Sequence, residues 1–322
     1  MPAKTKNALA EALKAIYIVV NTKGGVGKTT TSLQVVIPWL FERINKSATP
    51  SNETKKIKLY EIDENNDSKQ NFGNSQIMDT HLVVNPEKEL EDIFINECAS
   101  LERDYPIVFD IGVGPSTKAL DTLANITLDE KIIFIVPTKN DEDDYNDTLT
   151  TIEKIKQINK KPNIIIVCSD SRWDFGDEEN YLKPEFGLIF GEFLNLKTNK
   201  PFPSIFSQGA IDENYTSLTK TALFIETKVS MQQTLYEVAK TYSYIESSKG
   251  NNEYEKRLVD AKSKYEELAK AGDIEKASAA NKEFLLERKK LALFRSCKNF
   301  ATKNLYPVFE KLESIIISNF FN

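Results

Sequence analysis

The chain has 322 residues and a mass of 36.6 kDa, which allows one large α/β domain with an appendage. Its apolar content of 40% and charged content of 28% are typical of a globular protein and exclude a disordered chain. The net charge is −6, and three widely separated cysteines with a single histidine argue against a disulfide framework or a Cys/His zinc site. No stretch resembles a signal peptide, and no apolar run approaches the ~18 to 20 residues that span a bilayer. We therefore expect a soluble, cytoplasmic protein.

Short apolar runs alternate with longer polar stretches and predict the strands and helices of βαβ units. Residues 29–44 and 140–158 begin with hydroxyl or acidic residues, as crossover helices do, and Pro38 should kink or end the first of them. The fold class predicted is α/β, with a doubly wound, mostly parallel sheet. The predicted strands are IYIVV (16–20), IKLYEI (57–62), PIVFDI (106–111), IIFIVP (132–137) and NIIIVC (163–168), with FPSIF (202–206) as a weaker sixth.

The composition changes near Glu246. Residues 247–253 (SSKGNNE) are a linker candidate. Residues 254–302 are rich in Ala, Glu, Lys and Leu and predict a helical hairpin that is broken near residue 272. We therefore divide the chain into an α/β domain at residues 1–246 and a C-terminal α-helical extension at residues 247–322.

The last segment, residues 305–321, is amphipathic and more apolar than the hairpin. It has two possible roles, which are docking on the core or on a partner and lying on a membrane surface. Its polar positions lack the Lys/Arg bias of membrane-surface helices, so docking is favoured.

The stretch NTKGGVGKTT, from Asn21 to Thr30, follows the first apolar run directly. Strand, glycine-rich loop and hydroxyl-opened helix in this order predict a phosphate-binding loop rather than a glycine turn before a buried helix. The glycines let backbone amides face a phosphate, Lys28 would add a cation, and the Thr29 hydroxyl would ligate Mg²⁺. The predicted nucleotide-contacting residues here are Gly24, Gly25, Val26, Gly27, Lys28, Thr29 and Thr30.

An ordinary phosphate loop begins with glycine where this chain has Thr22, and here a second lysine, Lys23, follows. In this form the loop resembles the deviant Walker A motif of the ParA/MinD superfamily, whose partition branch often has Asn where Asn21 stands. The resemblance covers roughly residues 14–245 and not the C-terminal helices. It implies that Lys23 reaches the nucleotide of the second subunit in a homodimer and so takes part in catalysis. With EIDENN at residues 61–66 and a short N-terminus, the chain also resembles the StbB/TraL-like relatives of ParA.

A carboxylate for the attacking water is expected after the second predicted strand. The superfamily ends this strand with D-x-D-P-Q, and YEIDENN matches it with Glu61 and Asp63 at the acidic positions. The resemblance assigns the orienting or activating of water to Asp63. Glu64 and Asn65 stand in place of Pro-Gln, and Glu61 or Glu64 is the alternative to Asp63.

A second carboxylate, Asp110, ends the apolar strand in IVFDIGVGP. Its expected role is a direct or water-mediated contact to Mg²⁺, and its alternative role is a cap on the next helix. Gly112 follows and is expected to bring its backbone amide close to a γ-phosphate.

The resemblance implies a slow, partner-stimulated ATPase that binds ATP and Mg²⁺ and closes into a homodimer. Its expected task is plasmid or chromosome partition on nonspecific, nucleoid DNA with a ParB-like adaptor. The alternatives are a MinD-like positioning ATPase acting on a membrane or protein cargo, and a metabolic P-loop enzyme. Residues 288–303 carry six basic residues and no acid. The candidate DNA contacts are Arg288, Lys289, Lys290, Arg295 and Lys298, with a solvated helix face as the alternative.

Overall fold

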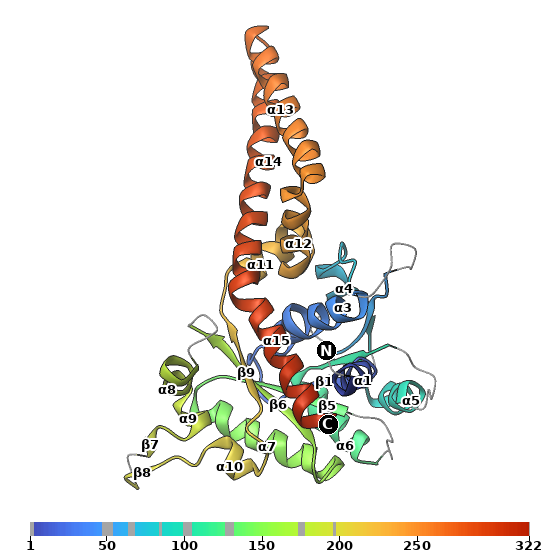
Figure 1. Cartoon of the computed structure of the whole chain (residues 1–322), viewed down its shortest axis with the longest axis vertical. Helices are drawn as coiled ribbons and strands as arrows, with labels where there is room; N and C mark the ends of the chain where they lie inside the picture. The colour runs from blue at the N-terminus through green and yellow to red at the C-terminus, as the bar shows by residue number, and fades with distance from the viewer. Residues whose placement is uncertain are drawn as a thin grey trace.

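The computed structural model describes residues 3–46, 54–63, 68–83, 86–98, 105–125, 132–172, 178–195 and 198–321. Its centre is a seven-stranded sheet with the strand order β3-β2-β4-β1-β5-β6-β9, in which neighbouring strands pair in parallel. Helices cover both faces of the sheet (Figure 1). The fold is therefore a doubly wound α/β fold with a parallel sheet and a C-terminal helical stretch, as the sequence predicts.

The five strong strand predictions are confirmed, and two further strands complete the sheet. β3 and β9 were missed because they are short and contain threonine, serine or charged residues in place of an apolar run. The strands are β1 (Ile16–Val19), β2 (Ile57–Ile62), β3 (Met78–Leu82), β4 (Ile107–Ile111), β5 (Ile132–Thr138), β6 (Asn163–Ser171) and β9 (Tyr215–Thr219). A separate antiparallel pair is formed by β7 (Leu194–Asn195) and β8 (Lys200–Pro201).

The weaker strand prediction at residues 202–206 is wrong. This segment leads into α10 (Ile205–Gly209), whose N-cap is Ser204. The Ser204 side chain accepts a hydrogen bond from the backbone amide of Ser207, as a serine cap does. Local capping therefore outweighs the apolar content of the segment.

The helices alternate with the strands in the first 220 residues and follow one another after β9. They are α1 (Ala3–Ala12), α2 (Lys28–Thr31), α3 (Ile37–Asn45), α4 (Ser68–Asn71), α5 (Pro86–Cys98), α6 (Val113–Asn125), α7 (Glu142–Ile158), α8 (Lys183–Glu185), α9 (Gly187–Phe190), α10, α11 (Leu223–Met231), α12 (Leu235–Glu246), α13 (Ser248–Lys270), α14 (Ile274–Phe300) and α15 (Tyr306–Ile315). Short π-helical turns are η1 (Ser32–Val36), η2 (Glu178–Leu182), η3 (Ala301–Leu305) and η4 (Ile316–Phe320).

The first crossover helix runs without a break from α2 through η1 to α3. Pro38 lies at the start of α3, directly after the π-helical turn. Proline cannot donate to the carbonyl four residues earlier and its ring crowds that carbonyl, so a wider turn before it relieves the conflict. Pro38 thus changes the helix geometry without ending the helix.

Alternate residues of the central strands enter two separate apolar cores. Tyr17 and Val19 point to the core that contains α3, α12 and α15. Ile16 and Ile18 point to the opposite core, which contains α5, α6 and α7. A period of two along a strand that is buried on both faces is the pattern of a doubly wound sheet.

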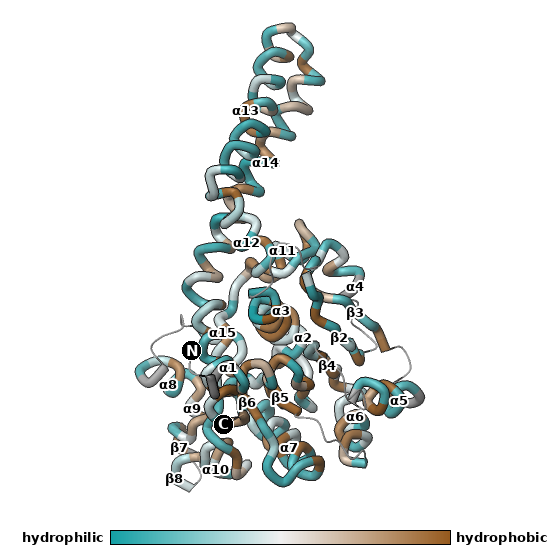
Figure 2. The backbone as a smooth tube through the Cα atoms, turned by 45° about the vertical axis from the view of Figure 1, so that its right-hand side comes forward, coloured by the Kyte–Doolittle hydropathy of each residue, from teal (hydrophilic) through white to brown (hydrophobic). Residues whose placement is uncertain are grey.

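The predicted helical hairpin is confirmed. α13 and α14 pack against each other, and together they form an arm, residues 248–300, that projects from the body (Figure 1). Hydrophilic residues predominate along the arm, whereas the central strands are largely hydrophobic and the helices packed on them carry residues of both kinds (Figure 2). No helix in the described part of the chain is long and apolar enough to cross a membrane.

The linker expected at residues 247–253 is absent, because these residues form the start of α13. Ser247 ends α12, and its side chain caps α13 by accepting a hydrogen bond from the amide of Gly250. A Cβ atom on Gly250 would lie 1.8 Å from the carbonyl oxygen of Tyr244. The two helices therefore meet at a tight junction that requires glycine at position 250.

The chain returns to the body after the arm. Phe309, Leu312, Ile315 and Ile316 are buried and belong to the same core as the sheet residue Val19. The terminal amphipathic segment thus docks on the core, which is the alternative that the sequence favours.

Candidate functional site

The glycine-rich loop joins β1 to α2 at the carboxyl edge of the sheet. Gly25 and Gly27 have positive φ angles of 73° and 92°, a region that side chains with a Cβ atom rarely adopt. A Cβ atom on Gly27 would also lie 3.1 Å from the hydroxyl of Ser169, near the end of β6. Val26 between these glycines is fully buried and anchors the loop in the body. The backbone therefore takes the curled form that a phosphate loop needs.

Lys28 lies under this loop and is largely buried, with 8% of its surface exposed. Its Nζ donates a hydrogen bond to the carbonyl oxygen of Lys23 at 2.7 Å, across the loop. Burial lowers the pKa of Lys28, and the charges of Asp110 and Asp63 oppose that shift. Both acids that the sequence proposes for hydrolysis therefore lie close enough to Lys28 to act on its charge.

Asp110 is the last but one residue of β4 and pairs in register with Val19 at the end of β1. The side chain is buried, and burial raises its pKa to about 7; the charge of Glu61 adds to the shift, whereas a hydrogen bond with Thr29 and the charge of Lys28 oppose it. Its Oδ2 has no hydrogen-bond partner among the described residues. A buried, unsatisfied carboxylate oxygen beside a threonine hydroxyl is a suitable pair of ligands for a hard cation.

Mg²⁺ fits this arrangement if protein side chains supply only one or two of its ligands and a bound phosphate group and water supply the others. The described residues contain no cluster of three or more His, Cys, Asp or Glu side chains that could hold a metal ion. Mg²⁺ commonly takes one or two protein oxygens and completes its octahedron with water and phosphate oxygens. Asp110 and Thr29 could supply those protein oxygens.

Asp63 follows β2 and packs against Gly112, which follows β4. A Cβ atom on Gly112 would lie 2.5 Å from Cγ of Asp63, and the Gly112 amide donates to the carbonyl oxygen of Ile62 at 2.8 Å. Glycine at position 112 thus leaves the space that the Asp63 side chain occupies. Glu61 pairs with Asp110 in register and is buried beside it, while Glu64 and Asn65 lie outside the described residues.

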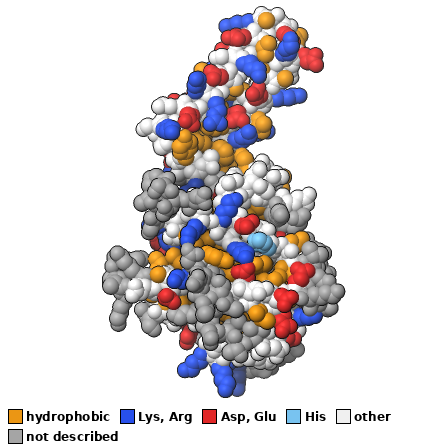
Figure 3. All heavy atoms as spheres, turned by 90° about the vertical axis from the view of Figure 1, so that its right-hand side faces the viewer, with side chains coloured by type: hydrophobic (Ala, Val, Ile, Leu, Met, Phe, Trp, Pro, Cys, Tyr) orange, Lys and Arg blue, Asp and Glu red, His pale blue; other side chains and the backbone are white. Residues whose placement is uncertain are grey.

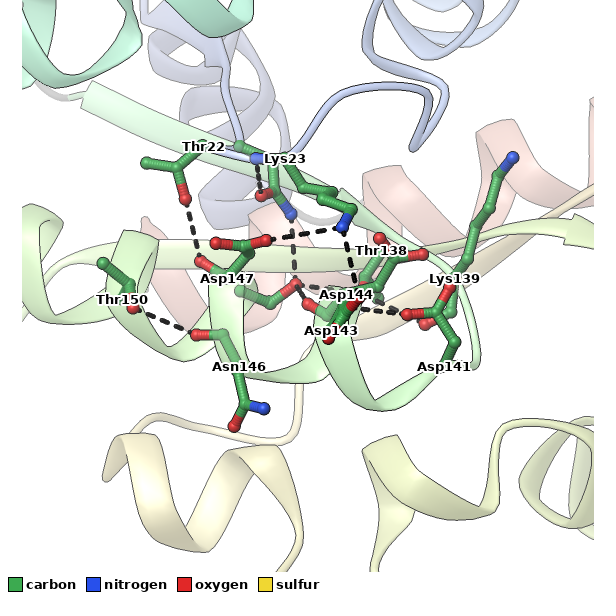
Figure 4. Close-up of polar contacts among 12 residues, drawn as sticks. Thr22, Lys23, Thr138, Lys139, Asp141, Asp143, Asp144, Asn146, Asp147 and Thr150 are labelled. Atoms are coloured by element: carbon green, nitrogen blue, oxygen red, sulfur yellow. Dashed lines mark hydrogen bonds and ion pairs between the residues drawn. The ribbon is translucent and has the colours of Figure 1, made fainter.

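Lys23 points away from the loop toward the first turns of α7 (Figure 4). Its Nζ lies 3.8 Å from Oδ2 of Asp143 and 3.8 Å from Oδ2 of Asp147, and one third of the side chain is exposed. Ion pairs of this length and exposure contribute little stability, so Lys23 can leave them at small cost.

Asn21 ties the loop to β5 and α7, a role that the loop motif alone does not show. Its Nδ2 donates to the carbonyl oxygen of Pro137 at 2.8 Å and to the Thr148 hydroxyl at 3.1 Å. Its Oδ1 accepts a hydrogen bond from the Lys23 amide at 2.9 Å. The Thr151 hydroxyl accepts one from the Thr22 amide at 3.0 Å. The contacts with Pro137, Thr148 and Thr151 span more than 100 residues of sequence, so a local pattern could not reveal them.

The start of α7 carries two aspartates with opposite environments (Figure 4). Asp141 caps the helix by accepting a hydrogen bond from the Asp144 amide at 2.7 Å, and this bond lowers the pKa of Asp141. Burial raises the pKa of Asp144 to about 6, and the contact with Asp141 adds to that shift. The α7 terminus therefore holds a buried acid next to an ionised one.

A cavity of about 160 Å³ adjoins the loop on the side of α11. Thr29 and Thr30 line one wall, and Phe224, Ile225 and Lys228 of α11 line another. The Phe224 ring contacts that of Phe300 at the base of the arm, with ring centres 5.7 Å apart. α11 thus lies between the helix that starts at the loop and the base of the arm.

The candidate DNA-contacting residues lie on α14 of the arm and not beside the loop (Figure 1). Lys290 pairs with Glu287 at 2.8 Å, and Lys298 pairs with Glu246. Arg295 donates from Nε to the Tyr242 hydroxyl at 3.1 Å. Arg288 lies over the ring of Phe284, whose centre is 5.7 Å from its guanidinium carbon.

Comparison with known proteins gives only a distant structural likeness. No family model and no curated protein matches the chain. One solved structure that matches is that of a candidate plasmid partition protein from Borrelia burgdorferi B31 bound to AMPPNP. The match has 13% sequence identity and a TM-score of 0.42, and it covers 68% of this chain and 90% of that chain.

Proposed function

We propose that the protein is an ATPase of the deviant Walker A type, which binds ATP with Mg²⁺ at residues 21–30 and acts as a dimerising switch. One observation carries the proposal. Beneath a loop with two glycines of positive φ, Lys28 interacts with the charges of Asp110 and Asp63, and Asp110 forms a hydrogen bond with Thr29. Phosphoryl transfer requires mainly positioning and charge stabilisation, and these residue types supply both.

Each residue has a distinct task in this scheme. The amides of residues 24–30 would cradle the phosphates, with Lys28 exchanging the Lys23 carbonyl for a phosphate oxygen. Asp110 and Thr29 would hold Mg²⁺, which neutralises charge on the phosphate oxygens when it is bound. Asp63 would orient the attacking water and take its proton. The Gly112 amide, which donates to the Ile62 carbonyl oxygen at 2.8 Å, would have to leave that bond to reach the γ-phosphate.

Lys23 would act in trans, on the nucleotide of a second subunit. Two features support this role. The ion pairs that hold Lys23 to α7 are long and exposed. Large apolar side chains are also exposed on α6, which starts beside the loop, and on α11, which lines the cavity next to Thr29 and Thr30: Val113 is 42%, Ile225 68% and Val229 75% exposed. A subunit face that closes over the nucleotide would cover such residues.

The process that this switch serves is proposed to be DNA partition with an adaptor protein. The candidate DNA surface is α14, through Arg288, Lys289, Lys290, Arg295 and Lys298. Two of these five cations are paired with acids of the chain, so DNA must compete with those acids at Lys290 and Lys298.

Nucleotide binding and turnover test the ATPase proposal. We expect Lys28→Ala to abolish Mg²⁺-dependent binding of a fluorescent ATP analogue, whereas Lys160→Ala, on an exposed lysine, leaves it unchanged. We expect Asp63→Ala to bind nucleotide normally and to release phosphate at least about 100-fold more slowly. Normal turnover by Asp63→Ala would move the water-orienting role to Glu61 or Glu64. Normal nucleotide binding by Lys28→Ala would contradict the proposal.

DNA retention tests the proposed process separately. ATP-bound protein should retain a DNA duplex of arbitrary sequence, with affinity that falls steeply between 50 and 200 mM salt (roughly 10³-fold or more for several phosphate contacts). The triple variant Arg288→Glu, Lys289→Glu, Lys290→Glu should lose retention and keep ATPase activity. Unchanged retention by this variant would remove α14 as the DNA surface.

A further inference from the structure

We propose that the arm carries a docking groove for an acidic amphipathic helix of a partner protein. The groove has a volume of about 390 Å³ and lies between the two helices of the arm. It combines an apolar floor with two guanidinium groups. Its lining residues are Leu258 from α13 and Phe284, Arg288, Leu291, Ala292 and Arg295 from α14.

The floor of the groove is apolar and open to a partner. Leu258 and Leu291 are half-buried, and Ala292 is exposed. Leu285, which is 45% exposed, lies seven residues before Ala292 and so on the same side of α14. Hydrophobic side chains of this kind, in a shallow groove between two helices, suit the apolar face of a third helix.

The two arginines fix the charge of the occupant. No carboxylate forms an ion pair with Arg288 or Arg295 within the described ranges, whereas Lys264 pairs with Glu283 at 3.1 Å on the same arm. The Arg288 guanidinium lies over the ring of Phe284, and Arg295 uses Nε for Tyr242. A guanidinium has five N–H donors in a planar fork, so both groups keep donors for carboxylates of a ligand.

The spacing of the arginines favours a helical ligand. Arg288 and Arg295 are seven residues apart on α14, which is about two turns or ~10 Å along the helix axis. Two carboxylates seven residues apart on a partner helix have the same separation. The occupant that complements the groove is therefore a helix with an apolar stripe and two acidic residues about two turns apart.

Two other occupants fit the groove less well. A second copy of the arm, paired symmetrically, would bring its own Arg288 and Arg295 toward the same arginines, and like charges oppose such pairing. DNA, proposed above as a ligand of α14, would use the two arginines but leave the apolar floor of the groove without a role. Lys289, Lys290 and Lys298 lie outside the lining of the groove and stay available to DNA. The basic residues of α14 are also spread around the helix rather than gathered on one face.

The groove inference does not depend on the proposed ATPase, so it is tested on the full-length chain without nucleotide. A display library of random 20-residue peptides is selected against the protein. Enriched peptides should show apolar residues at helical spacing and acids about seven residues apart. The selected peptides are then titrated by fluorescence anisotropy.

Three variants locate the binding. Arg288→Glu reverses one guanidinium charge. Ala292→Glu places a carboxylate four residues after Arg288 and three before Arg295, where it pairs with both arginines in the chain and stabilises the helix. We expect each to weaken peptide binding at least about tenfold. Lys282→Glu makes the same charge change as Arg288→Glu on a different side of α14 and should change binding less than about twofold.

Circular dichroism serves as the folding control for the three variants. The proposal would be overturned if no enriched peptide loses affinity in Arg288→Glu and Ala292→Glu. It would also be overturned if the enriched peptides lack acidic residues. If a 20-base-pair DNA duplex displaces the peptides, and Ala292→Ser binds that duplex as tightly as the parent does, the groove is a nucleic-acid site instead. If the protein forms an oligomer without peptide, and Ala292→Glu dissociates that oligomer, the groove is a contact between copies of the chain.

Discussion

At the scale of single residues, Gly112 sets the position of Asp63. In Gly112→Ala the new Cβ atom would lie 2.5 Å from Asp63 Cγ, so the carboxylate has to move. We expect phosphate release to fall about 10- to 100-fold, because small misplacements of a catalytic group are costly, while Mg²⁺–ATP binding changes little. Single-turnover hydrolysis and nucleotide titration measure the two effects separately.

Gly114 provides the matched control for Gly112. A Cβ atom there meets no atom within 4 Å, and the residue lies in the first turn of α6. Gly114→Ala should therefore keep full hydrolysis and gain up to about 1 kcal/mol of stability from its helix propensity. Equal loss of hydrolysis in both variants would show that Asp63 is not the group affected.

Asp144 predicts a pH dependence of stability. Burial raises its pKa to about 6 in the folded protein, so this acid keeps a proton that the unfolded chain has released. The folded state then binds more protons than the unfolded state between about pH 4 and pH 6, and stability from this group falls as pH rises. Asp144→Asn should match the parent near pH 4 and exceed it by about 3 kcal/mol at pH 7, because a rise in pKa from 3.8 to about 6 corresponds to that difference.

Urea unfolding at the two pH values measures this difference. Glu153→Gln changes the same charge on an exposed position of α7 and should show no such gain. If the difference in unfolding free energy between Asp144→Asn and the parent is the same at both pH values, the raised pKa of Asp144 is contradicted.

The residue scale also shows how far local sequence could go. The glycine motif predicted the curled backbone of the loop, because that follows from a short motif and its neighbours. It did not predict the side-chain contacts of Asn21 with Thr148 or the burial of Glu61 beside Asp110. Such contacts depend on which strands are neighbours, and that order is set by the whole sheet.

At the scale of elements, the junction of α12 and α13 depends on Gly250. Gly250→Ala would place a Cβ atom 1.8 Å from the Tyr244 carbonyl oxygen, and backbone atoms must shift to relieve the clash. We expect a loss of about 2 to 4 kcal/mol in unfolding free energy. Lys249→Ala, at an exposed neighbouring position, should stay within about 0.5 kcal/mol of the parent. Thermal unfolding of both variants tests the junction, and equal stabilities would contradict it.

The same junction explains why a linker was expected there. Serine, glycine and asparagine in residues 247–253 are typical of loops, and their helical role comes from the Ser247 cap and from the packing of α13 on α12. Strands β3 and β9 were missed for a related reason. They lie at the two edges of the sheet. β3 is largely exposed after Met78, and β9 buries threonine and serine, so neither has the continuous apolar run that marks the other strands.

At the scale of the whole molecule, the body and the arm meet through shared helices. α12 contacts both arm helices, and α15 carries the chain from the arm back into the sheet's core. Hydrophobic side chains gather where the arm meets the body, while charged side chains of both signs are mixed along the arm (Figure 3). The composition change near Glu246 located the arm, but only packing shows that the chain beyond it completes the body.

The central claim is that ATP joins two copies of the chain through Lys23. Sedimentation velocity with Mg²⁺ and a non-hydrolysable ATP analogue tests it most directly, on the parent protein and on Lys23→Ala. The account predicts that the parent sediments as a dimer with the analogue and as a monomer without it. It predicts that Lys23→Ala binds the analogue and stays monomeric, because the cation that reaches the second nucleotide is missing. Dimerisation of Lys23→Ala equal to that of the parent would contradict the account.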